Sequence, residues 1–233
     1  MQLEGDLGSW RPGQFVMLKV SNSLEPFLRR PFGILSAGAG RVELYYKVKG
    51  GGTQAMSRLC PGSQVGLLGP LGNGFAPCAP DVQPLMVAGG TGLPPILALA
   101  AALERGTLLL GARDRQEMPL AERVQAIAGV HSVFATEDGS LGHRGLVTEL
   151  MRRELAGQAG PVMVYACGPL AMLKAVAALA AEYGAACQVS LEERMGCGFG
   201  VCAGCAVGTT EGIRRVCKEG PVFDAAVMQW GQP

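Results

Sequence analysis

The chain has 233 residues, with 20 Lys and Arg against 19 Asp and Glu. This length is enough for one large domain or two modest ones around hydrophobic cores. A net charge of +1, with no run of basic residues longer than a pair, excludes an electrostatic surface for nucleic acid. Glycine is abundant at 35 residues, which indicates tight turns and close approaches between backbone and ligand.

The N-terminal segment shows no charged-then-apolar leader, so we expect a cytoplasmic protein whose eight cysteines are reduced. Residues 85–102 are long and apolar enough to raise the question of a membrane span. A Gly-Gly pair, a threonine and a Pro-Pro pair interrupt this stretch, so we expect no span there.

Residues 14–70 predict a small antiparallel β-domain. Its apolar and β-branched runs, at 14–20, 41–49 and 64–70, are separated by turns that contain Gly or Pro. The glycine run KGGGT leads into a short helix within 49–59 and is a candidate anion site. Residues 71–84 carry several turn formers around a single Phe, which predicts a linker.

From residue 84 the pattern changes to short apolar strands that alternate with Ala-rich helices. Such alternation predicts a parallel sheet with helices on both faces and a nucleotide at the carboxyl ends of its strands. The expected strands are 84–90, 107–113, 130–136, 161–168 and 187–192, and the expected helices are 94–105, 119–128, 145–156 and 169–183. The last forty or so residues show no long helix.

Four of the eight cysteines crowd together near the C-terminus. Cys197, Cys202 and Cys205 follow the spacing C-x4-C-x2-C, and eleven residues separate Cys205 from Cys217. This is the local spacing of plant-type [2Fe–2S] loops, whereas structural zinc sites generally present two separate narrow knuckles. The intervening residues are mostly Gly and Ala, which let backbone N–H groups approach the sulfurs. The pattern therefore favours [2Fe–2S] over zinc.

Two features lie where a parallel sheet would bind its ligand. Residues 87–96, VAGGTGLPPI, place a glycine-rich turn at a helix N-terminus, which favours a phosphate. Because Pro94 interrupts the G-x-G-x-x-G fingerprint, a plain strand-to-helix turn stays open. Cys167 ends another predicted strand. Its position leaves a structural and a functional thiol equally open, and we take it as the candidate catalytic residue.

Taken together, the segments PGQFVML, RRPF, GGGT, GGTGLPP, TEDGSLGHRG, YACGPLAML and SLEERMGCGFGVCAGC, with RVCKEGPVF, resemble the electron transfer subunit of NAD-dependent dihydroorotate dehydrogenase B. The resemblance runs from Pro12 to Phe223 and is most specific on either side of the cysteine loop. It implies an α+β multidomain fold. Its parts would be an antiparallel β-barrel FAD domain over 1–80, an α/β parallel-sheet NAD-binding domain over 81–190 and a small C-terminal [2Fe–2S] domain over 191–233.

The same resemblance implies which residues hold FAD, NAD and the [2Fe–2S] cluster. The flavin-binding residues would be Arg30, Pro31, Phe32, Gly33, Tyr45, Tyr46, Lys47, Gly52 and Thr53. The nicotinamide would approach between Gly89, Gly90, Thr91, Gly92 and Pro94 on one side and Cys167, Gly168 and Pro169 on the other. The metal ligands would be Cys197, Cys202, Cys205 and Cys217.

The implied function is that of an oxidoreductase subunit. An FMN-containing catalytic partner would oxidise dihydroorotate in pyrimidine (UMP) biosynthesis, and its electrons would reach NAD⁺ through the cluster and FAD. Two copies of each subunit would form a heterotetramer. A flavin suits the position between the cluster and NAD⁺, because it accepts electrons one at a time and can release two together.

Two features depart from the family pattern. Gly33 replaces the usual Ser of the flavin strand, which removes a hydroxyl that commonly hydrogen-bonds the flavin. Residues 1–11 offer only a weak strand, so we expect the first barrel strand to be missing or short, with an exposed sheet edge. We also expect Glu192 and Glu193, just before the cysteine loop, to position that loop or to meet the partner.

Two other interpretations stay open at the level of the sequence. One is the small subunit of an NAD(P)H/ferredoxin oxidoreductase or a sulfide dehydrogenase, but those relatives tend to alter the first cluster ligand and this chain keeps Cys197. The other is a regulatory or scaffolding module with a structural zinc ion.

Overall fold

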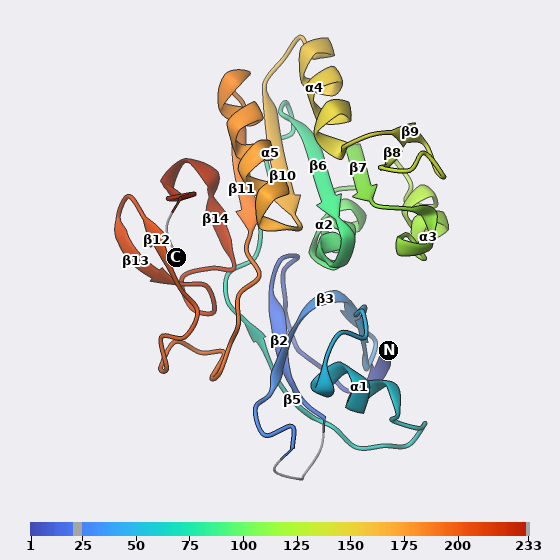
Figure 1. Cartoon of the computed structure of the whole chain (residues 1–233), viewed down its shortest axis with the longest axis vertical. Coiled ribbons are helices and arrows are strands. Elements are labelled where there is room, and N and C mark those ends of the chain that lie inside the picture. Colours follow the sequence, from blue (N-terminus) through green and yellow to red (C-terminus); the bar gives the residue numbers. More distant parts are fainter. Residues whose placement is uncertain (21–24, 232–233) are drawn as a thin grey trace.

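Three groups of strands organise the chain, which the computed structural model describes over residues 1–20 and 25–231 (Figure 1). The first group is an antiparallel half-barrel with the strand order β1-β4-β3-β2-β5. Its strands are β1 (Gln2–Glu4), β2 (Phe15–Lys19), β3 (Arg30–Gly38), β4 (Arg41–Leu44) and β5 (Gly66–Leu71), and helix α1 (Gly51–Ser57) follows β4. The weak strand expected within residues 1–11 is β1, which has three residues and pairs with β4.

The strand expected over 41–49 is shorter in the structure, because β4 ends at Leu44. Tyr45, Tyr46 and Lys47 instead turn away from the sheet and line a cavity. The chain then enters α1, whose Met56 is buried in the core of the half-barrel as expected.

The second group is a seven-stranded sheet in the order β14-β11-β10-β6-β7-β8-β9. All its neighbouring strands are parallel except β14, which runs antiparallel to β11. Its strands are β6 (Gln83–Gly89), β7 (Gly106–Ala112), β8 (Val130–Thr136), β9 (His143–Arg144), β10 (Val162–Cys167), β11 (Ala186–Ser190) and β14 (Val222–Asp224). The helices between them are α2 (Leu93–Leu103), α3 (Ala121–Gln125), α4 (Val147–Gly157) and α5 (Leu170–Glu182). Every strand and helix expected after residue 84 is therefore present.

The parallel strands are apolar throughout because both faces of their sheet are covered. Along β6, Leu85 and Val87 belong to the core under α4 and α5, whereas Met86 and Ala88 belong to the core under α2. This alternation is the period-2 geometry of a strand. No helix in the described residues is long and apolar enough to cross a membrane, and α2 has 11 residues.

The third group is the hairpin of β12 (Ala206–Thr209) and β13 (Gly212–Arg215), next to the cysteine loop. After this hairpin the chain returns to the large sheet as β14, an added strand that the sequence pattern did not predict. The first half of the linker of residues 71–84 is held at Asn73 and Ala76. Asn73 donates a backbone hydrogen bond to Gly220 O at 2.6 Å, and Tyr165 Oη donates one to Ala76 O at 3.0 Å.

Strand β2 is buried on both of its faces. Val16 and Leu18 pack in the half-barrel core, and both have no exposed surface. Phe15 and Met17 point the other way, into a core that also contains Cys205 and Cys217. One strand therefore separates the half-barrel from the cysteine loop.

The packing of the parallel sheet makes a testable prediction. Leu109 in β7 has no exposed surface, so Leu109→Ala leaves a cavity and lowers the free energy of unfolding by about 2–5 kcal/mol. Chemical denaturation, followed by circular dichroism, measures this loss. Leu146→Ala is the matched control because Leu146 is 55% exposed, and we expect a change within about 0.5 kcal/mol. Equal losses in the two variants would contradict the assigned core.

Candidate functional site

The carboxyl ends of β6 and β10 form the switch point of the large sheet. From β6 the chain continues through β7 and β8 in one direction, whereas β10 and β11 extend the sheet in the other. Crevices at such points bind nucleotides in open α/β sheets. The glycine-rich turn after β6 and the segment Cys167 to Pro169 after β10 both lie here, as the sequence predicted.

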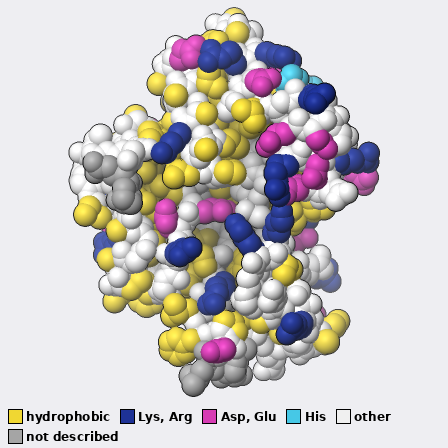
Figure 2. Space-filling model, viewed as in Figure 1, with side chains coloured by type: hydrophobic (Ala, Val, Ile, Leu, Met, Phe, Trp, Pro, Cys, Tyr) yellow, Lys and Arg dark blue, Asp and Glu magenta, His cyan; other side chains and the backbone are white. Residues whose placement is uncertain are grey.

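A cavity of about 1520 Å³ lies between this edge and the half-barrel. Figure 2 shows a hollow at mid-height of the molecule with Lys and Arg side chains gathered around it. Most residues expected to bind FAD or to flank the nicotinamide line the cavity. They are Arg30, Pro31, Phe32, Gly33, Tyr45, Tyr46, Lys47, Thr53, Gly90, Thr91, Pro94, Cys167 and Pro169.

Four expected glycines are not in the cavity wall but lie directly behind it: Gly52, Gly89, Gly92 and Gly168. A Cβ on Gly52 would lie 2.6 Å from Arg30 Nε, and one on Gly92 would meet the carbonyl of Cys167. Because these glycines have no side chain, the neighbouring segments pack closely against them, and this packing fixes the residues of the cavity wall.

Several wall residues were not expected from the sequence. Phe27 and Leu28 come from the segment before β3, and Arg113, Asp114 and Glu117 follow β7. The segment from Ser190 to Met195 follows β11. The rule that ligands bind at carboxyl ends of parallel strands was a usable signal for the last two groups. Glu192 and Glu193 thus face the cavity, a place the sequence did not predict for them.

Ion pairs connect the half-barrel to the parallel sheet at the edge of the cavity. Glu117 accepts a hydrogen bond from Lys47 Nζ at 2.6 Å and another from Arg113. These two donors hold the pKa of Glu117 down at about 2, so it is ionised at neutral pH. Arg123 in α3 pairs with Glu43 in β4 at 2.7 Å. Both pairs join the half-barrel to the part of the chain that contains the parallel sheet, and the pair of Lys47 and Glu117 lies in the cavity wall.

Cys167 lies in the cavity wall but is buried, with 1% of its area exposed. Burial raises the pKa of its thiol, and the nearby charge of Glu192 raises it further, while a hydrogen bond with Ser190 acts in the opposite direction. The side chain is therefore a neutral thiol at physiological pH and not a thiolate nucleophile.

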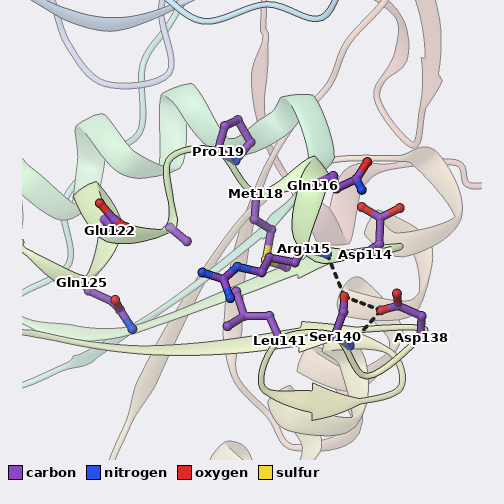
Figure 3. A pocket seen from close by; sticks show the side chains of 11 residues that line it. Asp114, Arg115, Gln116, Met118, Pro119, Glu122, Gln125, Asp138, Ser140 and Leu141 are labelled. Atoms are coloured by element: carbon purple, nitrogen blue, oxygen red, sulfur yellow. Dashed lines mark hydrogen bonds between the residues drawn. The ribbon is translucent and has the colours of Figure 1, made fainter.

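A second cavity of about 690 Å³ continues from the first along the carboxyl ends of β7 and β8, and the two share Asp114, Gln116 and Pro119. Figure 3 shows Arg115 at its centre, with Glu122 and Gln125 on one side and Asp138 on the other. Ser140 ties this wall together, because its hydroxyl donates to Asp138 at 2.6 Å and accepts from the N–H of Arg115 at 2.8 Å.

The four clustered cysteines form two pairs. Cys197 Sγ lies in hydrogen-bond contact with Cys202, and Cys205 Sγ accepts from the N–H of Cys217 at 3.4 Å. Cys205 and Cys217 are buried, whereas Cys202 is exposed and Cys197 is half-buried. No group of three or more His, Cys, Asp or Glu side chains within the described ranges is close enough to hold a single metal ion.

The two pairs differ in acidity. Burial opposes ionisation of Cys197, but N–H groups of Cys202, Phe199 and Val201 outweigh it and lower the pKa to about 6. Burial and the neighbouring Cys205 raise the pKa of Cys217 to about 12. Donor N–H groups aimed at sulfur are the environment that an anionic cluster requires. The donor set therefore fits a [2Fe–2S] cluster, whose two irons take four thiolates.

The cysteine loop is held against the half-barrel by close packing. Gly198 has φ +83°, and a Cβ there would meet Met17 of β2. Arg215 donates to Gly200 O at 2.7 Å and to Glu219 at 2.6 Å, which fixes the loop from the opposite side. The buried, inner pair, Cys205 and Cys217, thereby packs against β2. Strand β3, which pairs with β2 in the half-barrel, lines the cavity.

Comparisons with known proteins agree with this geometry. A family model described as the iron-sulfur cluster binding domain of dihydroorotate dehydrogenase B matches residues 192–229, and an oxidoreductase NAD-binding domain matches residues 86–178. A curated protein of Desulforamulus reducens, "Dihydroorotate dehydrogenase B (NAD(+)), electron transfer subunit", is 40% identical over 94% of this chain and 87% of its own length. The chain belongs to this family of electron transfer subunits.

Other members of the family are similarly related. The electron transfer subunit of Caldanaerobacter subterraneus subsp. tengcongensis is 37% identical over 91% of this chain and 84% of its own.

Among solved structures, one titled as an NADH-dependent reduced ferredoxin-NADP oxidoreductase has a TM-score of 0.85 and is 28% identical over 98% of this chain and 84% of its own. A ferredoxin reductase in carbazole 1,9a-dioxygenase, at 20% identity, shares the fold, with a TM-score of 0.68 over 79% of this chain and 60% of its own. The family carries FAD, NAD and [2Fe–2S] cofactors, and the alternative of a different small subunit is not favoured.

The close approach at Gly52 predicts how FAD binding responds to a single methyl group. Gly52→Ala pushes the Arg30 side chain out of the cavity wall and lowers the amount of FAD that co-purifies, measured by flavin absorbance per chain. Gly51→Ala is the matched control, because a Cβ at the preceding position meets nothing within 4 Å. Equal FAD content in both variants would show that Arg30 does not contribute to flavin binding.

The buried cysteine pair makes a second prediction. Cys205→Ser replaces a soft thiolate with a harder oxygen ligand, so iron and acid-labile sulfide per chain fall to a small fraction of the wild-type content. Cys60→Ser serves as the control, because Cys60 is exposed and far along the chain from the cysteine loop. Wild-type iron and sulfide in Cys205→Ser would remove this residue from the ligand set.

Proposed function

We propose that this chain carries electrons between a catalytic partner that oxidises dihydroorotate on FMN and the final acceptor NAD⁺, in the cytoplasmic synthesis of pyrimidines. The names of its relatives support this function. The observation that carries it is the position of the inner cysteine pair against β2, beside the sheet whose strand β3 lines the large cavity. A cluster there and a flavin in that cavity would be close enough for electron transfer without a mobile carrier.

Each cofactor has a set of residues that we propose to hold it. FAD would take the large cavity, with its phosphates facing Arg30 and Thr53 and its ring against Gly33, Tyr45 and Lys47. When bound, FAD supplies both one-electron and hydride chemistry. Gly33 offers no hydroxyl to that ring, so hydrogen bonding at this position comes from the backbone.

NAD would enter at the switch point. The turn from Gly89 to Gly92 precedes α2 and presents backbone N–H groups to its phosphates. The nicotinamide would lie between this turn and the segment Cys167 to Pro169, and the smaller cavity beside Asp114 would receive the rest of the molecule. Cys167 would act there as a neutral neighbour of the nicotinamide.

The cysteine loop would face the partner. In the outer pair, Cys202 is exposed and Cys197 is half-buried, and the residues between them include Phe199 and Val201, which are 53% and 76% exposed. Exposed apolar side chains around a redox centre are suited to a subunit contact. We propose that the catalytic subunit docks on this loop, in a heterotetramer of two plus two subunits, and that electrons enter by the outer pair and leave by the inner one.

The proposed division into domains follows these roles, with FAD bound mainly by residues 1–80, NAD by 81–190 and the cluster by 191–233. Strand β14 lies in the last range but pairs with β11. The cluster domain would therefore be fastened to the nucleotide domain by a shared sheet as well as by the packing on β2.

Reconstitution with the partner tests the function. We expect the chain, co-purified with an FMN-containing dihydroorotate dehydrogenase, to give a complex that reduces NAD⁺ when dihydroorotate is added. The same complex built with Cys205→Ser should fall to the background of the partner alone, because its cluster is lost. NAD⁺ reduction by the partner alone at the rate of the wild-type complex would refute the proposal.

A further inference from the structure

Reduction of NAD⁺ needs a proton as well as electrons: NAD⁺ + 2e⁻ + H⁺ → NADH. On the proposed function, on which this inference rests, both electrons arrive singly through an iron–sulfur cluster, which conducts no protons. One proton per turnover must therefore reach the flavin side of the large cavity by another route. A carboxyl group that lies in that cavity and can gain and lose a proton is the simplest carrier.

Glu192 has such a position. It follows Leu191, whose N–H donates to Pro221 O at 2.9 Å, so the backbone at the end of β11 is fixed. Its side chain lines the large cavity together with Ser190 and Cys167, beside the segments that flank the proposed nicotinamide position. It is also accessible to solvent through the cavity. The carboxyl group of Glu192 is therefore open to water and lines the same cavity as Cys167, the last residue of β10.

The surroundings of Glu192 favour proton binding. Burial by the cavity walls raises the pKa of Glu192, and the positive charge of Lys49 acts to lower it. No hydrogen bond or ion pair to its carboxylate occurs among the described residues, so neither protonation state is locked. Its charge also raises the pKa of the Cys167 thiol, which lines the same cavity at the end of β10.

Three other proton-binding groups on the walls, Glu117, Asp114 and Cys167, are less suited to the role. The charged or titratable side chains that share the cavity are Arg30, Tyr45, Tyr46, Lys47, Lys49, Arg113, Asp114, Glu117, Cys167, Glu193 and Arg194. Glu117 is held ionised by Lys47 and Arg113. Asp114 accepts the N–H of Glu117 at 3.1 Å, and burial keeps Cys167 a thiol.

We propose that Glu192 is the proton carrier of this site, which takes a proton from water in the cavity and delivers it to the flavin as the two electrons arrive. The hydride that leaves for NAD⁺ then contains those two electrons and that proton. Water reprotonates the carboxylate for the next turnover, so the protein returns to its starting state and no co-reactant beyond dihydroorotate and NAD⁺ is needed.

The test uses Glu192→Gln, which keeps the size of the side chain and removes its titration. In the complex with the FMN-containing partner, stopped-flow flavin absorbance after dihydroorotate addition gives the rate of FAD reduction. We expect this rate in the wild type to fall as pH rises through the pKa of Glu192, because the protonated form is the donor. In Glu192→Gln the rate falls about 10²-fold and this pH dependence is lost. Iron and FAD content stay at wild-type levels.

Chemical rescue separates proton transfer from a structural role. Glu192→Ala should regain FAD reduction when formate is added, because a small acid can occupy the vacated space. Hydride transfer from NADH to FAD takes no proton from water, so its rate should change much less than the rate of FAD reduction by dihydroorotate. Glu193→Gln is the control for charge, since it removes a neighbouring carboxylate of the same cavity wall, and it should keep the wild-type pH profile.

The outcomes are distinct. A wild-type complex that fails to reduce NAD⁺ with dihydroorotate overturns the proposed function and this inference with it. A working wild-type complex in which Glu192→Gln keeps the rate and the pH profile overturns only the proton route. Equal slowing of both the NADH reaction and the dihydroorotate reaction, without rescue by formate, would show a structural role and also overturn it.

Discussion

The burial of β2 on both faces is the constraint on which the arrangement of the cofactor sites depends. Val16 and Leu18 complete the core of the half-barrel, while Phe15 and Met17 complete the core around the inner cysteines. All four side chains are 4% exposed or less, so neither contact can be lost without exposing apolar surface to water. Surface ion pairs alone would hold a cluster loop only weakly, since such pairs contribute little energy. Packing on a shared strand keeps it in place.

Strand packing also positions the switch point of the large sheet. Because β6 and β10 are neighbours and parallel, the turns that follow them lie side by side without any long-range adjustment. Ion pairs between Lys47 and Glu117, and between Glu43 and Arg123, then join this edge to the half-barrel. The cavity is thus defined by two sheets, and the end of β3 and the loops at the edges of the sheets supply its chemistry.

The sequence was informative where local chemistry determines the structure. The alternation after residue 84 predicted five of the parallel strands and the four helices between them, and the cysteine spacing predicted an iron–sulfur loop, which the family model over residues 192–229 confirms. Strands β9 and β14 were not predicted, because strands of two or three residues that pair with distant segments leave no periodic signal, and β4 ends earlier than expected. Glu192 and Arg113 both follow parallel strands, so the carboxyl-end rule places them at one edge of the sheet, but the cavity they share also depends on how the half-barrel packs against that edge.

The cavity contains carboxylates whose environments give them different properties. Glu117 lies between Lys47 and Arg113, which stabilise its anion so strongly that it serves as a fixed charge linking the two walls. Glu192 has no such partner among the described residues, and partial burial at the cavity wall raises its pKa, so its neutral form is more accessible than that of Glu117. Environments that separate the pKa values of two acids in one site commonly divide their roles between holding and transferring protons. In this chain the division follows the architecture, because Glu117 joins the two sheets whereas Glu192 begins the segment that leads to the cysteine loop.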